Sequence, residues 1–343
     1  MKLLEQLYKI SSPSRQEKVM IKFILKQLNR MGVKYTIDKS GNIYATKGIS
    51  GTYPCIVSHT DEVHRTHPKG FQILTVAENL IFGYDPNSRQ HVGIGADDKN
   101  GIWICLKCLE EFDVLKCAFF VSEEIGCIGS SVADMLFFSD CRFVLQCDRR
   151  GYSDIVTKAN MTELCSRNFL QDVCAINFGY KEVDGMLTDV VMLKDKGLNI
   201  SCVNISCGYY YPHSEHEFTN IKDLIRCLDL VKYIIVNCRR VYKHEKVSRK
   251  QFNLGIPSSR SYFFGLRREP DRRTNSFVVE YDNMQDELAA LLRYHRELTI
   301  DEIMNRIGIK YPQMTVREYE NAYLEITGSL PSKSFSKHSD ESK

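Results

Sequence analysis

The chain of 343 residues contains no apolar run that could span a membrane, because none approaches the roughly 18 consecutive residues that a spanning helix needs. Its N-terminus, Met1 to Gln6, mixes charged with apolar residues and shows neither the apolar core nor the small-residue cleavage site of a signal peptide. These absences predict a cytoplasmic protein that does not bind membranes.

A large excess of charge of one sign is also absent. The 46 Lys and Arg residues nearly balance the 43 Asp and Glu residues, which leaves a formal net charge of +3. This balance does not predict nucleic acid as a partner of the molecule as a whole. Any binding to a polyanion would have to involve one positively charged region of the chain.

A second C-x-x-C pair is missing. The chain has 13 cysteines, but they are scattered and mostly flanked by apolar residues, which is typical of buried, reduced thiols. The one close pair, Cys105 and Cys108, lies in an apolar stretch with the character of a buried helix. Without a second pair, the sequence favours that helix over a zinc knuckle or a redox motif.

What is present is an alternation of apolar strands with amphipathic helices. Ser14 to Glu17 has the form of a capping box before a helix over about 15–31. Continuous apolar strands that alternate with helices predict an α/β fold, with a mainly parallel mixed sheet and helices on both faces. Strands are predicted at 33–37, 43–45, 53–58, 116–121, 142–147 and 200–206, with one or two more within 151–187, a hairpin within 60–93, and helices at 98–112, 130–138, 189–196 and 219–236.

The last third of the chain differs in composition. Between Arg239 and Arg273, eleven Lys or Arg residues stand against three acidic ones, a local excess of +8. A solvated linker and a polyanion-binding face both fit this composition, and no nucleic-acid motif accompanies it. A helix is predicted at 288–298 and a polar, disordered end after it. The predicted domains are a main domain over 1–238, a basic linker or extension over 239–283, a small helical segment over 284–330 and a disordered tail over 331–343.

Polar residues follow the ends of successive predicted strands. In open parallel sheets these ends meet at one edge, where ligands bind. Each such residue alone could be a helix cap or a surface side chain, but together the carboxylates would repel one another without a counter-charge. Imidazoles mixed with carboxylates suit zinc, with cobalt or manganese as alternatives. The set comprises His59, Asp61, Asp97, Asp98, Glu123, Glu124, Asp148 and His213.

The order of these motifs resembles that of the co-catalytic dinuclear zinc exopeptidase superfamily, which includes peptidase T and the glutamyl and leucyl aminopeptidases. The resemblance covers residues 1–238 and implies that two Zn²⁺ ions bind. The matching segments are His59-x-Asp61, Gly95-Ala96-Asp97-Asp98-Lys99, Glu123-Glu124-x-Gly126-x-x-Gly129, Asp148 and His213-Ser214-x-x-Glu217.

The resemblance also implies a role for each matching residue. His59 and Asp148 would hold one metal ion, and Glu124 and His213 would hold the other. Asp97 would bridge the two ions, through a cis peptide to Asp98. Among the remaining residues, the resemblance makes Glu123 the general base and Asp61 the acceptor of the His59 ring N–H. For Asp98 and Lys99 we expect structural roles, through hydrogen bonds or charge balance around Asp97.

The spacing of the motifs departs from that of relatives with large insertions. Only 35 residues separate Asp61 from Asp97, and about forty separate Asp148 from the Thr188-Asp189 pair. Neither interval holds a lid or dimerisation domain, so a bare catalytic domain is expected. Candidate substrate-binding residues are Arg149, Arg150, Asp189 and Tyr211, for which surface ion pairing, a helix N-cap and loop packing are the alternatives.

We therefore expect a metallohydrolase, specifically an aminopeptidase that cleaves the N-terminal peptide bond of a peptide. One alternative is a zinc deacylase or carboxypeptidase that acts on N-acylated amino acids. The other is a non-catalytic, metal-stabilised binding protein whose basic segment contacts an acidic partner. Because every ligand position and the base are filled, the sequence favours an enzyme. Its expected partner is a peptide or an acylated amino acid as substrate, and an oligomer is compatible with the sequence.

Overall fold

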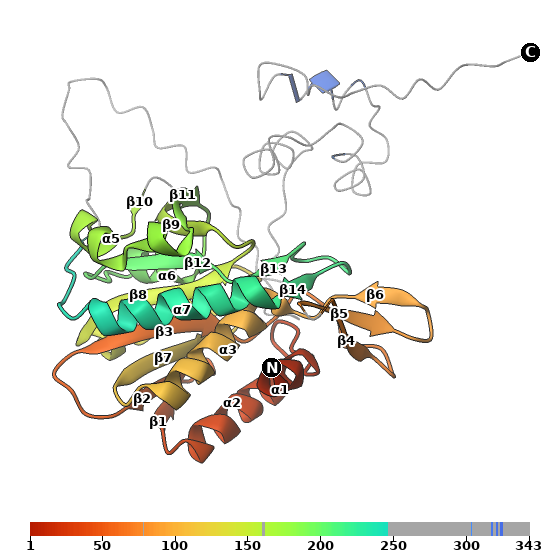
Figure 1. The fold of residues 1–343 in the computed structure, drawn as a ribbon, viewed down its shortest axis with the longest axis horizontal. Helices are drawn as coiled ribbons and strands as arrows, with labels where there is room; N and C mark the ends of the chain where they lie inside the picture. Colours follow the sequence, from red (N-terminus) through yellow and green to blue (C-terminus); the bar gives the residue numbers. More distant parts are fainter. Residues whose placement is uncertain are drawn as a thin grey trace, which may run out of the picture. The chain divides into compact units, whose positions relative to one another are not determined.

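The computed structural model describes residues 1–77, 79–159 and 162–245, together with residues 303, 317, 320, 321, 323 and 324. The chain divides into two compact units, Met1–Lys250 and Gln251–Lys343, and the first unit carries the fold described below (Figure 1). No helix in these described ranges is long and apolar enough to cross a membrane.

A nine-stranded mixed sheet forms the centre of the first unit. Its strands follow the order β1-β2-β7-β3-β8-β12-β9-β10, with β11 paired to β9. The four central strands, β7, β3, β8 and β12, are parallel, whereas β1 and β2 add antiparallel strands at one edge. The strands are β1 (Lys34–Ile37), β2 (Ile43–Lys47), β3 (Tyr53–His59), β7 (Leu115–Phe120), β8 (Cys141–Arg149), β9 (Asp154–Ala159), β10 (Thr162–Glu163), β11 (Lys181–Gly185) and β12 (Cys202–Ser206).

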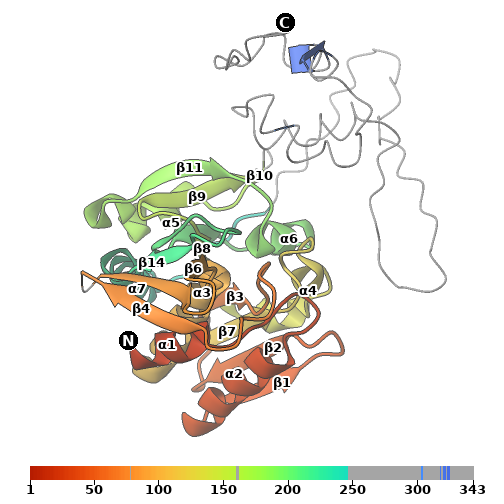
Figure 2. The same ribbon diagram turned by 90° about the vertical axis from the view of Figure 1, so that its right-hand side faces the viewer.

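Helices cover both faces of this sheet (Figure 2). Successive side chains of β3 point to opposite faces, so Ile56 packs in one core while Cys55 and Val57 pack in the other. This burial on both faces explains the continuous apolar character of β3 and confirms the predicted α/β class. The first core contains α1 (Lys2–Tyr8), α2 (Lys18–Arg30), α3 (Ala96–Glu111), α5 (Arg167–Val173) and α7 (Ile221–Asn237); the second contains the 3₁₀ helix η1 (Met135–Phe138) and α6 (Asp189–Asp195).

A smaller five-stranded sheet lies beside the first (Figure 1). Its strand β14 pairs with β5 although they are more than a hundred residues apart, with Phe218 opposite Phe82 and Thr219 opposite Ile81. This pairing carries the loop that precedes β14 to the segment that follows β6. The strands are β4 (Gln72–Val76), β5 (Leu80–Asp85), β6 (Gln90–Val92), β13 (Tyr209–Tyr210) and β14 (Phe218–Asn220).

Most predicted elements are confirmed, but the capping box at Ser14 is wrong. The helix α2 starts later, and its N-cap Glu17 makes no capping hydrogen bond. Both side chains have other partners: Ser14 Oγ donates to Asp61 Oδ2 at 2.7 Å, and Glu17 Oε1 accepts the backbone N–H of Ser122 at 3.2 Å. These tertiary partners replace the local hydrogen bonds that the pattern predicts.

Two further segments differ from the prediction. The helix expected over 130–138 is broken into α4 (Ile128–Ser131) and η1, because the Asp134 side chain caps a new turn by accepting the Leu136 N–H at 3.0 Å. The described residues of the interval 151–187 form three strands, α5 and the 3₁₀ helix η2 (Ala175–Phe178), more than the one or two strands predicted. The helix α1 was not predicted.

The cysteines are buried as predicted. Twelve of the 13 are buried and Cys174 is partly exposed, while Cys105 and Cys108 lie inside α3. The predicted basic linker beyond residue 245, the helix at 288–298 and the tail at 331–343 lie outside the described residues. All the predicted domain boundaries, including the one at residue 238, stay predictions.

Candidate metal centre

The five predicted metal ligands meet at the carboxyl ends of the parallel strands. His59 ends β3, Asp148 lies near the end of β8, and Glu124 follows β7, while Asp97 starts the α3 segment. His213 comes from the loop between β13 and β14, which the second sheet carries to the same place. The topology thus gathers residues that are more than 150 positions apart in the chain.

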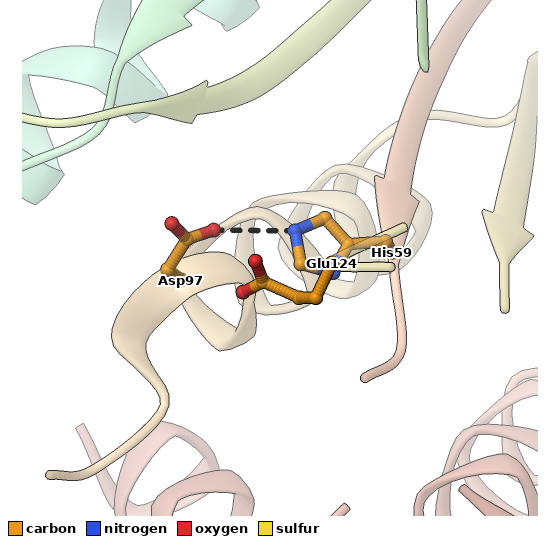
Figure 3. Close-up of side chains that lie close together, drawn as sticks. All are labelled: His59, Asp97 and Glu124. Atoms are coloured by element: carbon orange, nitrogen blue, oxygen red, sulfur yellow. Dashed lines mark hydrogen bonds and ion pairs between the residues drawn. The ribbon is translucent and has the colours of Figure 1, made fainter. Parts of the chain in front are cut away.

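The Asp97 carboxylate lies between two groups of ligands. Its Oδ1 is 3.2 Å from His59 Nε2, which is itself 3.7 Å from Asp148 Oδ1. Its Oδ2 is 3.4 Å from His213 Nε2, which is 3.1 Å from Glu124 Oε2. Figure 3 shows the Asp97 carboxylate facing the His59 ring, with the Glu124 carboxylate beside them. One oxygen of Asp97 therefore faces each group.

Ligand atoms in this region are close enough to share a metal ion. Those of His59, Asp97 and Glu124 lie within 4.8 Å of one another, and so do those of His59, Asp98 and Asp148. The oxygens of Asp98 are already engaged by the backbone, because they accept the N–H groups of His59 at 3.2 Å and Gly101 at 2.9 Å. Asp98 is thus structural, and the peptide that joins it to Asp97 is cis, as expected.

Two glycines, the α3 N-cap Gly95 and Gly101 inside α3, are required by close neighbours. Gly95 has φ = 61°, in the left-handed region, and a Cβ built there would lie 2.0 Å from Glu62 Oε2. A Cβ at Gly101 would lie 2.3 Å from Asp98 Oδ1. The carboxylates beside these two glycines therefore leave no space for a larger side chain.

Glu217 holds the backbone of this turn, a role that the sequence did not reveal. It is buried and accepts the N–H groups of Ile94 at 3.1 Å, Gly95 at 2.7 Å and Asp97 at 3.2 Å. His64 Nε2 lies 3.0 Å from the same carboxylate. The only sequence signal was its place in the motif that begins at His213. Glu217 therefore orients Asp97 through the main chain.

Asp61 performs a similar task on the other side of the centre. Its carboxylate accepts the N–H groups of Glu123 at 2.9 Å and Glu124 at 3.2 Å, and its Oδ1 lies 3.3 Å from His59 Nδ1. His59 Nδ1 also lies 3.1 Å from the Asp61 carbonyl oxygen. Asp61 thus fixes the loop that carries both glutamates as well as the His59 ring, a broader role than the sequence predicted.

The two neighbouring glutamates point to different partners. Glu124 Oε2 faces His213 at 3.1 Å, whereas Glu123 lies with Oε1 3.2 Å from Cys127 Sγ and with Oε2 4.0 Å from His59 Nε2. Such divergence is possible because both glutamates lie on the loop between β7 and α4, where neighbouring side chains can point to different sides.

Tyr209 also enters the centre and lies outside the set of site residues predicted from the sequence. Its side chain is buried, and its hydroxyl donates to Asp97 Oδ2 at 3.1 Å and lies 3.4 Å from Asp148 Oδ1. A phenol that donates to a metal-binding carboxylate orients that ligand.

We expect Tyr209→Phe to lower the affinity for metal by about 10- to 100-fold, because Asp97 loses a donor that orients it. Titration against a competing chelator measures the change. Tyr210→Phe is the matched control, since the Tyr210 hydroxyl donates to Asp223 at 2.7 Å, away from the centre. Equal affinities in the two variants would refute the orienting role.

The electrostatics of the centre favour a bound cation. Burial, aided by nearby carboxylates and opposed by His59, raises the pKa of Glu123 to about 8, and burial also raises the pKa of Glu124 and Asp148. Glu124 Oε1 is buried, and no hydrogen-bond donor reaches it from within the described ranges. Buried carboxylates with missing partners are costly, so the donor set fits divalent metal ions.

The candidate substrate-binding residues lie in different environments. Arg149 pairs with Asp154 at 3.3 Å, which is the ion-pairing alternative that the sequence left open. Arg150 is exposed, and Tyr211 is 67% exposed with its ring 5.9 Å from that of Phe218. Asp189 is close to the centre, because a ligand atom of its carboxylate lies within 4.8 Å of one from Glu123.

No protein-family model and no curated protein sequence matches the chain. Solved structures do match it. The aminopeptidase PepT from Bacillus cereus superimposes with a TM-score of 0.57 at 14% identity, over 68% of this chain and 96% of that chain. A tripeptidase from Staphylococcus aureus gives a TM-score of 0.57 at 14% identity, over 70% of this chain and 98% of that one.

A third match is the TET1 peptidase of Pyrococcus horikoshii, which can assemble into a tetrahedron or a large octahedral shell. It has a TM-score of 0.53 at 14% identity, over 68% of this chain and 98% of that chain. The chain therefore has the fold of these peptidases, which confirms the fold that its motifs predicted.

Proposed function

We propose that the protein is a dinuclear zinc aminopeptidase that hydrolyses the N-terminal peptide bond of peptides. The observation that carries the proposal is the position of Asp97, with one carboxylate oxygen toward His59 and the other toward His213. A carboxylate shared in this way is suited to bridge two cations. The fold shared with aminopeptidases supports the same function.

The ligands divide into two sets around Asp97. His59, Asp148 and Asp97 Oδ1 would hold one zinc ion, and His213, Glu124 and Asp97 Oδ2 would hold the other. Bound zinc would acidify a water molecule and polarise the scissile carbonyl, with cobalt or manganese as substitutes. The His213 side chain is 53% exposed, so its edge of the centre is open to substrate.

Glu123 is the proposed general base. Its carboxylate is not among the proposed ligands, and Oε2 lies 4.0 Å from His59 Nε2, at the edge of the metal centre. The raised pKa of about 8, which burial causes, brings this carboxyl close to neutral pH, where a group can both accept and return a proton. Glu123 would take a proton from water and pass it to the leaving amine.

The charge of the centre favours an aminopeptidase over a carboxypeptidase. Six carboxylates but only two histidines line it, and no lysine or arginine pairs with any of the six in the part of the chain that the structure describes. Two bound zinc ions would neutralise four of these six charges, and the negative charge that is left would attract the ammonium group of a free N-terminus and repel a substrate carboxylate. The six are Asp61, Asp97, Asp98, Glu123, Glu124 and Asp148.

The test is hydrolysis of a panel of peptides by the full-length protein loaded with zinc, cobalt or manganese. Each peptide is offered with a free and with an acetylated N-terminus, and metal content is measured on the same sample. We expect cleavage of the first peptide bond only when the N-terminus is free. Cleavage that requires acylation would favour a deacylase, and a protein with two bound metal ions but no turnover would contradict the proposal.

A further inference from the structure

A second group of ligand atoms lies next to the metal centre and is used by neither set of proposed ligands. One carboxylate oxygen of Glu123, one of Asp189 and the thiol sulfur of Cys127 lie within 4.8 Å of one another. Glu123 links this group to the centre, because its Oε1 is 3.2 Å from Cys127 Sγ while its Oε2 faces His59 at 4.0 Å. The three residues come from the loop after β7, the N-cap of α4 and the start of α6.

Asp189 shows that this group is incomplete without a further partner. Its side chain is fully buried, its Oδ2 accepts a long hydrogen bond of 3.3 Å from Gln146 Nε2, and the nearby Ser130 side chain also stabilises the carboxylate. No donor within the described part of the chain reaches its Oδ1. A buried carboxylate oxygen without a partner is costly, and a cation satisfies it.

The chemistry of the three donors selects the cation. A thiolate is a soft ligand that prefers zinc-like ions, and carboxylate oxygens complete such sites. We propose that Glu123, Cys127 and Asp189 form a third metal site, which takes a thiophilic divalent cation such as Zn²⁺ or Cd²⁺ and thereby inactivates the general base. On binding, the S–H bond of Cys127 breaks, its proton passes to solvent, and a sulfur–metal bond forms.

The consequence for activity follows from Glu123. A carboxylate that is bound to a cation at the third site no longer accepts a proton from water, so excess metal inhibits the enzyme that the first two ions activate. This inhibition rests on the proposed function, whereas the metal site itself does not. The two are therefore measured separately.

The first experiment measures binding of Cd²⁺ to the full-length protein that already holds two equivalents of zinc. We expect one further equivalent of cadmium, with zinc unchanged, and a sulfur-to-cadmium charge-transfer absorption in the ultraviolet. In Cys127→Ser this absorption disappears and the affinity for cadmium falls at least about tenfold, a loss typical of removing a metal-site residue. Asp189→Asn weakens binding as well.

A matched control is Cys174→Ser. Cys174, like Cys127, has a left-handed backbone, with φ = 49° against 54°, but its thiol donates to the carbonyl of Gln171 at 3.0 Å. Cadmium binding by this variant should equal that of the wild type. If Cys127→Ser does not fold, Cys127→Gly suits the left-handed backbone and removes the same ligand. Unchanged charge-transfer absorption in the Cys127 variant would overturn the site.

The second experiment follows peptide hydrolysis during the same titration, with each variant compared with itself in the absence of cadmium. We expect inhibition to develop with the third equivalent in the wild type and in Cys174→Ser, but not in Cys127→Ser. Inhibition that persists in Cys127→Ser would overturn the regulatory part of the proposal. A wild-type protein that binds the third equivalent but has no activity to inhibit would contradict the proposed function and leave the site supported.

Discussion

Replacing Glu123 by glutamine is expected to lower kcat for peptide hydrolysis by about 10²- to 10⁴-fold, the range that a positioned general base contributes. Glutamine keeps the size of the side chain but cannot accept the proton from water. Because Glu123 lies outside both proposed ligand sets, the variant should still bind two metal ions. Steady-state kinetics and metal analysis of the same sample measure the two effects.

Glu124→Gln is the matched control for this prediction. The neighbouring residue faces His213 at 3.1 Å and belongs to a proposed ligand set, so its loss should reduce the metal content as well as the activity. The adjacent glutamates should thus give different results, inactive but metal-bound for Glu123→Gln, and metal-deficient for Glu124→Gln. Normal kcat in a metal-loaded Glu123→Gln protein would remove Glu123 from the mechanism.

Replacing Glu217 by alanine is expected to lower the free energy of unfolding by about 3–5 kcal/mol, as removal of one partner from a buried charged network does. The substitution leaves the buried N–H groups of Ile94, Gly95 and Asp97 without their acceptor. Chemical denaturation of the metal-free protein measures the change. Metal affinity should fall with it, because the turn no longer presents Asp97 in one orientation.

Two further variants sharpen this prediction. Glu215 is exposed and lies two residues earlier, so Glu215→Ala should change stability by no more than about 0.5 kcal/mol. In Glu217→Gln the amide oxygen can replace Oε2, which accepts from Ile94 and Gly95, while the amide NH₂ meets the N–H of Asp97. Glu217→Gln should therefore retain most of the wild-type free energy of unfolding but bind metal more weakly than the wild type. Equal free energies of unfolding for Glu217→Ala and the wild type would show that the turn keeps its conformation without Glu217.

The architecture and most residues of the candidate metal centre were predictable because they rest on local patterns. A strand buried on both faces, such as β3, must be continuously apolar, and this pattern is visible without any tertiary contact. Parallel strands place their carboxyl ends at one edge of the sheet. This general rule was enough to predict that the polar residues after each strand lie close together. His59, Glu124 and Asp148 were found in this way.

The residues that orient those candidate ligands could be identified only from the tertiary structure. Glu217 and Tyr209 reach Asp97 only because β14 pairs with β5 across more than a hundred residues, and no local pattern encodes that pairing. Ser14 stands in a sequence that fits a capping box, yet its hydroxyl donates a hydrogen bond to Asp61 instead. A sequence motif shows which groups are able to bind metal, whereas long-range hydrogen bonds between buried groups decide how each is held.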